Sequence, residues 1–318
     1  MKPFLLQAPC KDYVWGGNRL RDYGKQSDAA RIAESWELSC YPDGESVIAS
    51  GEFAGMTLSA FLEKHPEALG TNCRRFDRFP VLVKLIDAQE NLSVQVHPDD
   101  AYALGHEGEL GKTELWYIID AAPGAEILYG VENTMTKDEL RRSIEDGSIT
   151  DKLRHIPVHP GETYFIPAGT LHAIGKGCLI AEVQQNSNTT YRVYDYGRGR
   201  TLHIDKALDV ARLTPSRNRK TAQGDIPGTN CRVQNLGRCG YFSTQVFQIV
   251  ENLPLCHGRE SRGWTFEHWL CLDGHGVLHH DEGDLAFQKG DSIFVPADVP
   301  CREISGDCTM LNTIVEPT

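Results

Sequence analysis

The sequence predicts a mainly β protein built from two related β-units with few helices. Short apolar runs, typical of strands, recur along the chain. The 30 Gly and 16 Pro are scattered rather than clustered, as in proteins with many strands and turns. A pattern of residues in the first half also returns, in altered form, in the second half. Each observation is justified below.

The strands are predicted from apolar and β-branched runs bounded by turn residues. The candidates are residues 46–49, 81–86, 92–97, 115–119, 163–166 and 179–183. Helical spacing is found in residues 58–64, 137–144 and 205–211. Thr57 precedes the first of these helices and is a favoured N-cap residue. The sequence therefore predicts strands as the main elements.

The internal repeat joins two pairs of segments. Residues 114–120 match residues 267–273, and residues 161–172 match residues 290–301. The separation between the paired segments is 24 residues longer in the first copy, and those residues include the predicted helix at 137–144. We therefore expect a helical insertion near residues 134–155. His172 in the first copy is replaced by Cys301 in the second.

A polar segment with Pro and Gly separates the two copies, as a linker does. We accordingly expect a first domain at residues 1–215, a linker at 216–230 and a second domain at 231–318. Because only the first copy keeps the residues that could bind a metal, we expect it to be catalytic and the second to be degenerate.

Composition restricts the partners. The net charge is −12 and the sequence pI is near 5.5, which argues against nucleic acid as the main partner. A small phosphorylated substrate needs only a local group of Lys and Arg. No run approaches the ~20 apolar residues of a membrane span. Ten Cys without a CxxC pair, in a chain with no evident export signal, suggest reduced thiols in the cytoplasm. The oligomeric state cannot be inferred.

Four residues suggest a metal site. Gln95 and His97 lie two apart on a predicted strand, so their side chains leave the same face. Glu114 opens the next apolar run, and His172 follows a turn. Imidazole and carboxylate are ligands of catalytic Zn²⁺, which keeps a position open for water or substrate. The sequence therefore suggests a metalloenzyme.

The spacing Gly-x5-Pro-x-Gly-x2-His, which ends at His172, resembles the second motif of the cupins, although their usual Asn is Lys176 here. The altered first motif, Gln95-x-His97 with Glu114 seventeen residues later, resembles type I phosphomannose isomerases, and the short bacterial form fits best. The resemblance covers nearly the whole chain, through residues 13–17, 33–37, 92–100, 111–114 and 182–195.

This resemblance implies two cupin-like antiparallel β-barrel (jelly-roll) units. It also implies the interconversion of mannose 6-phosphate and fructose 6-phosphate through an enediol, with one Zn²⁺ per chain. The implied ligands are His97, Glu114 and His172, with Gln95 as a fourth. Gln95 would be the weakest of the four, because amide oxygen is a weaker donor to Zn²⁺ than imidazole.

By the same resemblance, Arg192 is the active-site arginine, and Glu182 and Lys112 are the candidates for proton transfer. Geometry has to decide between the last two. Candidate phosphate contacts, suggested by residue type alone, are Lys84, Ser93, Arg198 and Arg200.

Two other classes remain open from the sequence. One is a different metal-dependent cupin enzyme, either an Fe²⁺ oxygenase, which also favours two His and a carboxylate, or another sugar-phosphate isomerase. Metal analysis with an O₂-consumption test separates the oxygenase. The other is a non-catalytic sugar-binding cupin, which would bind the sugar phosphate without converting it.

Overall fold

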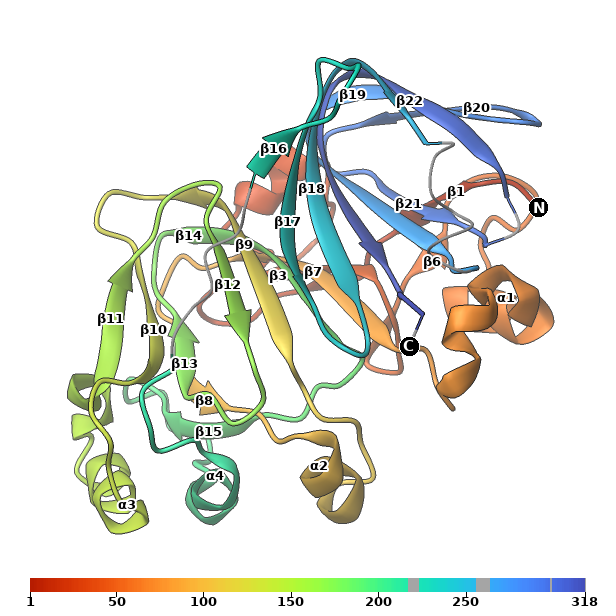
Figure 1. Cartoon of the computed structure of the whole chain (residues 1–318). Helices are drawn as coiled ribbons and strands as arrows, with labels where there is room; N and C mark the ends of the chain where they lie inside the picture. Colours follow the sequence, from red (N-terminus) through yellow and green to blue (C-terminus); the bar gives the residue numbers. More distant parts are fainter. Residues whose placement is uncertain (217–222, 256–263, 298, 318) are drawn as a thin grey trace.

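The computed structural model describes residues 1–216, 223–255, 264–297 and 299–317. Three large antiparallel sheets form layers, with short helices at the periphery (Figure 1). The prediction of a mainly β protein is confirmed. In these ranges no helix is both long enough and apolar enough to cross a membrane.

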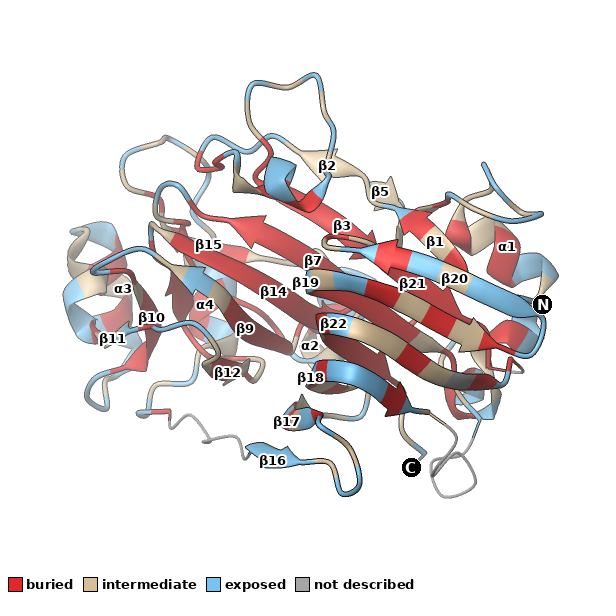
Figure 2. Cartoon of the chain, turned by 90° about the horizontal axis from the view of Figure 1, so that it is seen from above, coloured by how far each residue is buried: buried red, intermediate tan, exposed pale blue. Residues whose placement is uncertain are grey.

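The middle layer is a six-stranded sheet, and it is buried on both faces (Figure 2). Its strands in spatial order are β12 (Thr163–Ile166), β9 (Glu114–Ala121), β14 (Cys178–Gln185), β7 (Val81–Asp87), β3 (Glu34–Leu38) and β2 (Cys10–Lys11). Successive side chains on a strand point to opposite faces. On β9, Trp116 and Ile118 accordingly join one core cluster, whereas Leu115 and Tyr117 join another. A strand buried on both faces needs a continuous apolar run.

A five-stranded sheet packs on one face of the middle layer. Its strands in order are β11 (Leu153–Pro157), β10 (Glu126–Val131), β13 (His172–Ile174), β8 (Val94–Val96) and β15 (Tyr191–Tyr194). Ile127, Tyr129 and Ile174 of this sheet pack in the same cluster as Trp116. The residues that the sequence analysis suggests as metal ligands therefore lie on or next to strands of these two sheets, which face each other.

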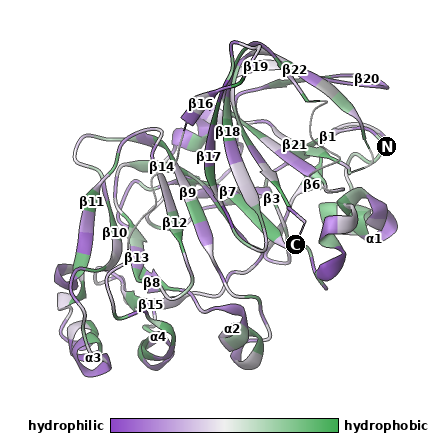
Figure 3. Ribbon diagram, viewed as in Figure 1, coloured by the Kyte–Doolittle hydropathy of each residue, from purple (hydrophilic) through white to green (hydrophobic). Residues whose placement is uncertain are grey.

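Helices cover the outer side of the five-stranded sheet and one end of the molecule (Figure 1). They are α1 (Leu58–Lys64), α2 (Asp100–His106), α3 (Lys137–Glu145) and α4 (Ile204–Val210), with 3-10 turns η1 (Arg19–Tyr23), η2 (Pro66–Leu69), η3 (Thr71–Arg75) and η4 (Ser148–Lys152). Leu140 of α3 and Leu208 of α4 are buried in the same hydrophobic cluster as Leu128 of β10. Their other residues are mostly polar, as Figure 3 shows.

The other face of the middle layer packs on a nine-stranded sheet. Its order is β16 (Gln223–Asp225), β17 (Arg232–Arg238), β18 (Ser243–Pro254), β22 (Cys301–Ile314), β19 (Glu267–His280), β21 (Ser292–Val295), β1 (Phe4–Gln7) and β6 (Val47–Ile48), with β20 (Gly283–Gln288) on β19. Strands β4 (Cys40–Tyr41) and β5 (Gly44–Glu45) form a separate pair. The N-terminal strands β1 and β6 thus lie in the same sheet as the C-terminal segment.

The two larger sheets share part of their strand order. The series β21-β19-β22-β18-β17 parallels β12-β9-β14-β7-β3. The residue pairing matches as well, because Glu114 pairs with Ile166 and Glu267 pairs with Val295. These positions are the ones that the sequence repeat aligns.

The predicted strands and helices are present, with small shifts at their ends. Thr57 caps α1 by accepting a hydrogen bond from the backbone N–H of Ala60. The sequence analysis missed α2, although Asp99 is a residue type that favours its N-cap and accepts from the Tyr102 N–H. Of the expected linker, residues 217–222 lie outside the described residues, and β16 pairs with β17.

Candidate active site

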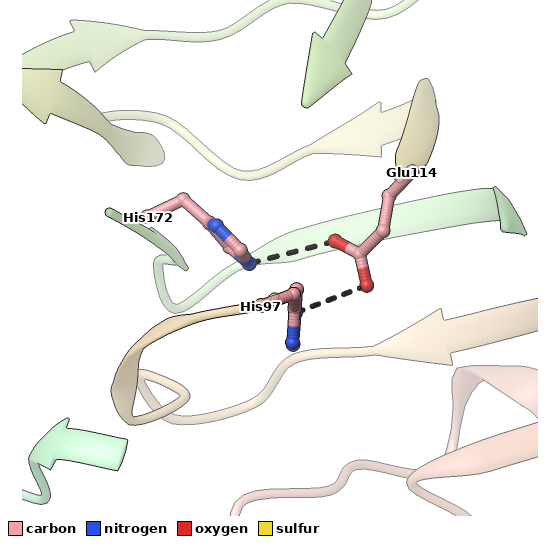
Figure 4. Close-up of side chains that lie close together, drawn as sticks. All are labelled: His97, Glu114 and His172. Carbon is pink, nitrogen blue, oxygen red and sulfur yellow. Dashed lines mark ion pairs between the residues drawn. The ribbon is translucent and has the colours of Figure 1, made fainter. Parts of the chain in front are cut away.

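The predicted metal ligands come together between the two facing sheets. His172 on β13 is the cross-strand partner of Gln95 on β8, and His97 directly follows β8. Glu114 opens β9 on the opposite sheet. The candidate ligand atoms of His97, Glu114 and His172 all lie within 4.8 Å of one another, and the three residues are buried (Figure 4).

The imidazole orientations follow from their outer hydrogen bonds. His97 Nδ1 donates to the Thr189 carbonyl at 2.9 Å, and His172 Nδ1 donates to the Thr170 carbonyl at 2.8 Å. A carbonyl can only accept, so each Nδ1 carries the proton. Each Nε2 then faces Glu114, at 3.3 Å for His97 and 3.5 Å for His172.

Electrostatics keeps the inward-facing atoms of this cluster, Nε2 of each histidine and the Glu114 carboxylate, free of protons. Burial lowers the pKa of His97, and it lowers that of His172 to about 3, so both rings are neutral. Burial opposes ionisation of Glu114, but the nearby Lys112 ammonium holds the pKa of the carboxyl well below its usual range. Two ring lone pairs therefore face a carboxylate.

Such a cluster fits a cation. Among the described residues, neither His97 Nε2 nor Glu114 Oε2 has a hydrogen-bond partner, and Glu114 Oε1 has the Lys112 ammonium at 2.8 Å as an ion-pair partner but no hydrogen bond. Buried polar atoms without partners are costly. A metal ion would satisfy all three at once, and two imidazoles with one carboxylate form a common catalytic ligand set for Zn²⁺.

Two further predicted residues lie at the edge of the cluster. Lys112 Nζ is 2.8 Å from Glu114 Oε1 and is buried. The side-chain amide nitrogen of Gln95 is 3.5 Å from His172 Nε2. Amide oxygen and nitrogen are assigned by inference in protein structures, so a half-turn of the amide would direct its oxygen to the cluster instead.

Glu182 and Arg192 reach the site from different strands. Glu182 on β14 accepts a hydrogen bond from the indole N–H of Trp116 at 2.8 Å, and Trp116 lies two residues beyond Glu114 on β9. Burial and the charge of Glu114 raise the pKa of Glu182 to about 7. Arg192 on β15 is the cross-strand partner of Gln95, so its side chain leaves the same face of the five-stranded sheet.

The sequence analysis missed Glu34, and it named Lys84 only as a candidate phosphate contact, without its two carboxylate neighbours. Lys84 Nζ is buried, 3.4 Å from Glu34 and 3.8 Å from Glu182. The sequence does offer an indication for Glu34, because residues 34 and 36 are two apart on a strand and their side chains therefore point to the same face. Arg198 and Arg200, the other basic candidates for phosphate, both form ion pairs with Asp195.

Facing antiparallel sheets with a candidate metal cluster between them are consistent with the cupin class of protein, whose members are built from double-sheet jelly rolls. Residues 4–118 match the model of the phosphomannose isomerase type I catalytic domain, and residues 233–315 match that of the mannose-6-phosphate isomerase cupin domain.

Several known proteins that are similar to the chain are named mannose-6-phosphate isomerases. A mannose-6-phosphate isomerase of Streptococcus mutans is 39% identical over 98% of this chain and 97% of its own length. A probable mannose-6-phosphate isomerase of Bacillus subtilis is 47% identical over 97% and 98%. The crystal structure of the Bacillus subtilis mannose 6-phosphate isomerase superposes with a TM-score of 0.90 at 36% identity, over 98% of this chain and 99% of that one. The chain therefore belongs to the type I phosphomannose isomerase family, and it is an isomerase.

Proposed function

We propose that the chain interconverts mannose 6-phosphate and fructose 6-phosphate with one Zn²⁺ held by His97, Glu114 and His172, and by Gln95 as a fourth ligand. The observation that carries the proposal is the buried cluster of proton-free ligand atoms, in a chain of this family. A Zn²⁺ bound there would act as a Lewis acid toward the sugar oxygens.

We assign the proton transfer between carbons to Glu182. The isomerisation moves a proton from C2 of the aldose to C1, and a hydroxyl proton from O2 to O1, with an enediol between the two half-reactions. The Glu182 carboxylate takes the proton from C2 and returns it to C1. A pKa of about 7 suits a group that must both accept and donate a proton near neutral pH.

Arg192 and Lys112 supply positive charge in this proposal. The guanidinium of Arg192 is cationic at any working pH and would stabilise negative charge that develops on the sugar oxygens. Its Nε has no hydrogen-bond partner among the described residues. Lys112 Nζ forms an ion pair with Glu114 Oε1 at 2.8 Å. This contact favours a role for Lys112 in orienting that carboxylate over a role as the catalytic base.

We also propose that residues 1–215 form a catalytic cupin-like barrel unit and residues 231–318 a degenerate copy, joined by the segment 216–230. The shared strand order and the matching residue pairs support this division. β1 and β6 are an exception to this division, because they lie within residues 1–215 but pair in the C-terminal sheet and would complete the second unit.

The helical insertion near residues 134–155 belongs to the same proposal. In the first copy, α3 and η4 lie between β10 and β11. In the second copy, only β20 lies between β19 and β21. In the second copy, Cys301 occupies the position that aligns with His172 of the first copy.

The test is a coupled assay of mannose 6-phosphate isomerisation before chelation, after chelation and after zinc is added back. We expect activity to disappear on chelation and to return with zinc, and Glu182→Gln to lose turnover while it keeps the metal. Oxygen consumption by the metal-loaded protein, or binding of mannose 6-phosphate without formation of fructose 6-phosphate, would contradict the proposal.

A further inference from the structure

A row of buried side chains crosses the inner face of the six-stranded sheet. Trp36, Lys84, Glu182 and Trp116 are successive cross-strand partners on β3, β7, β14 and β9. Partners in register point to the same face of a sheet. Glu114 lies two residues from Trp116 on β9, so the row and this metal-type carboxylate share that face.

Lys84 lies between two carboxylates in this row. Its Nζ is 3.4 Å from Glu34 Oε2 and 3.8 Å from Glu182 Oε1, and only 4% of its side chain is exposed. Each carboxylate also accepts an indole N–H, Glu34 from Trp36 at 2.7 Å and Glu182 from Trp116 at 2.8 Å. Glu182 thus has an ion pair with the ammonium at one oxygen and a hydrogen bond from the indole at the other.

This arrangement does not suit a phosphate contact. Two carboxylates and one ammonium leave the group formed by Glu34, Lys84 and Glu182 with a net negative charge. A phosphate dianion would be repelled by that charge in a buried site. The ammonium also already has two anionic partners, which is how buried charges are stabilised.

We propose that Lys84 is a positioning residue of the isomerase site, whose ammonium fixes the carboxylate of Glu182 in the orientation needed for proton transfer. Glu34 is the second anchor of Lys84, and Trp116 is the second anchor of Glu182. The inference rests on the proposed function, in which Glu182 moves the proton between the carbons.

The charges that face Glu182 set the expected effect. They are Lys84 on β7, Glu34 on β3, Glu114 on β9 and Lys112 just before β9. Without Lys84, Glu182 keeps both negative neighbours and only one positive one. A carboxyl near more negative charge releases its proton at higher pH. Removal of Lys84 must therefore move the pH dependence of turnover as well as its size.

The test compares Lys84→Met with Lys11→Met in the zinc-loaded protein. Lys11 is a matched control, because its Nζ lies 4.5 Å from the centre of the Trp36 ring and that of Lys84 lies 4.8 Å, but only Lys84 pairs with Glu182. For Lys84→Met we expect kcat to fall about tenfold or more with KM little changed. We also expect the acid limb of the kcat profile to move up by about one pH unit. Lys84→Arg should restore part of kcat, and Lys11→Met should behave as the parent.

A loss of kcat that is uniform across pH would overturn the positioning role, since that is the effect of a merely structural lysine. A raised KM with unchanged kcat would overturn it in favour of substrate binding. If Lys84→Met does not fold, the double variant with Glu34→Gln removes the unpaired anchor charge and should fold. Its acid limb should shift less than that of Lys84→Met, because a negative neighbour of Glu182 is lost as well. The readout in that variant is kcat, which should still fall about tenfold or more with KM little changed. A parental kcat in the folded double variant would overturn the role.

An activity-independent measurement separates this inference from the proposed function. The infrared band of the Glu182 carboxyl, identified by its loss in Glu182→Gln, can be titrated with and without Lys84. A higher midpoint in Lys84→Met supports the role of Lys84, and an unchanged midpoint overturns it. Full turnover by Glu182→Gln would instead show that Glu182 is not the base, which overturns the proton-transfer assignment and leaves the infrared result to judge the contact.

Discussion

Gln95 and His172 are direct cross-strand partners, and the amide nitrogen of Gln95 lies 3.5 Å from Nε2 of His172. This nitrogen atom of His172 is also the one that faces Glu114. The β8–β13 pairing therefore brings a neutral amide to the edge of a cluster that otherwise contains two imidazoles and a carboxylate.

Gln95→Ala should weaken zinc binding without abolishing it, because His97, Glu114 and His172 remain in place. We expect a loss of affinity of about tenfold or more, measured by competition with a chelator. Gln245→Ala on β18 removes an amide far from the cluster and serves as the control. Equal affinities for the Gln95 variant and the parent would remove Gln95 from the ligand set.

His172→Ala should remove metal and activity together, since it deletes one of three buried ligands. Cys301→Ala should leave the zinc content unchanged, because the second copy, apart from Glu267, lacks the other ligands. Zinc per chain and the isomerase assay measure both effects. Loss of zinc from the Cys301 variant would refute the division between a catalytic and a degenerate unit.

Arg192→Ala should keep the metal and lose turnover. The side chain does not belong to the buried cluster, and its Nη1 donates to the Thr201 carbonyl at 3.2 Å. Removing a group that stabilises charge in the transition state lowers kcat by about 10²-fold or more. Metal content and kcat test this together, and a zinc-free Arg192 variant would mean that the arginine supports the metal cluster.

His155 on β11 should make stability depend on pH. Its Nδ1 lies 2.8 Å from Glu126 and its Nε2 lies 3.1 Å from the Thr150 carbonyl, and both partners can only accept. The bond to Glu126 raises the pKa of His155. The stabilisation is therefore complete below the unfolded pKa of about 6.5 and is lost as the pH rises through the folded value.

We expect His155→Gln to destabilise the protein more at about pH 5.5 than at about pH 8.5. Both side chains are nearly half exposed, so the effect should stay below about 1 kcal/mol. Urea unfolding at the two pH values measures it. Glu126→Gln should abolish the same pH-dependent part, and an equal loss at both pH values in the His155 variant would contradict the contact.

The cluster of candidate ligands and most strands could be predicted from local patterns. Gln95 on β8 and His97 directly after it lie two apart in the sequence, and β12 extends over the predicted residues. Such features depend on neighbours in the sequence, because strand side chains alternate with a period of two.

The surroundings of Lys84 could not be predicted in that way. Its contacts with Glu34 and Glu182 depend on the register of β7 against two other strands, and their sequence separations are 50 and 98 residues. The joining of β1 to the C-terminal strand β21 is likewise a long-range pairing. Local composition carries no information about which distant strands become neighbours.

The repeat makes a final prediction about two equivalent turn glycines. Gly161 has φ of 87° and Gly290 has φ of 88°, a region in which other residues are strained. A Cβ on Gly161 would meet nothing within 4 Å. A Cβ on Gly290 would lie 2.0 Å from the Tyr23 carbonyl oxygen, and the Gly290 carbonyl accepts from Lys25 at 2.6 Å. Of these two turns, the N-terminal segment therefore packs against the one at Gly290 and leaves the one at Gly161 open.

Gly161→Ala should therefore cost only the conformational strain, about 1 kcal/mol of unfolding free energy. Gly290→Ala should cost about 1–3 kcal/mol more, because the backbone around Tyr23 must move away from the added methyl group. Urea unfolding of the two variants under the same conditions measures the difference. Because the φ angles match, equal losses would mean that the contact between Tyr23 and this turn relaxes freely, and the N-terminal segment would then not constrain the second unit.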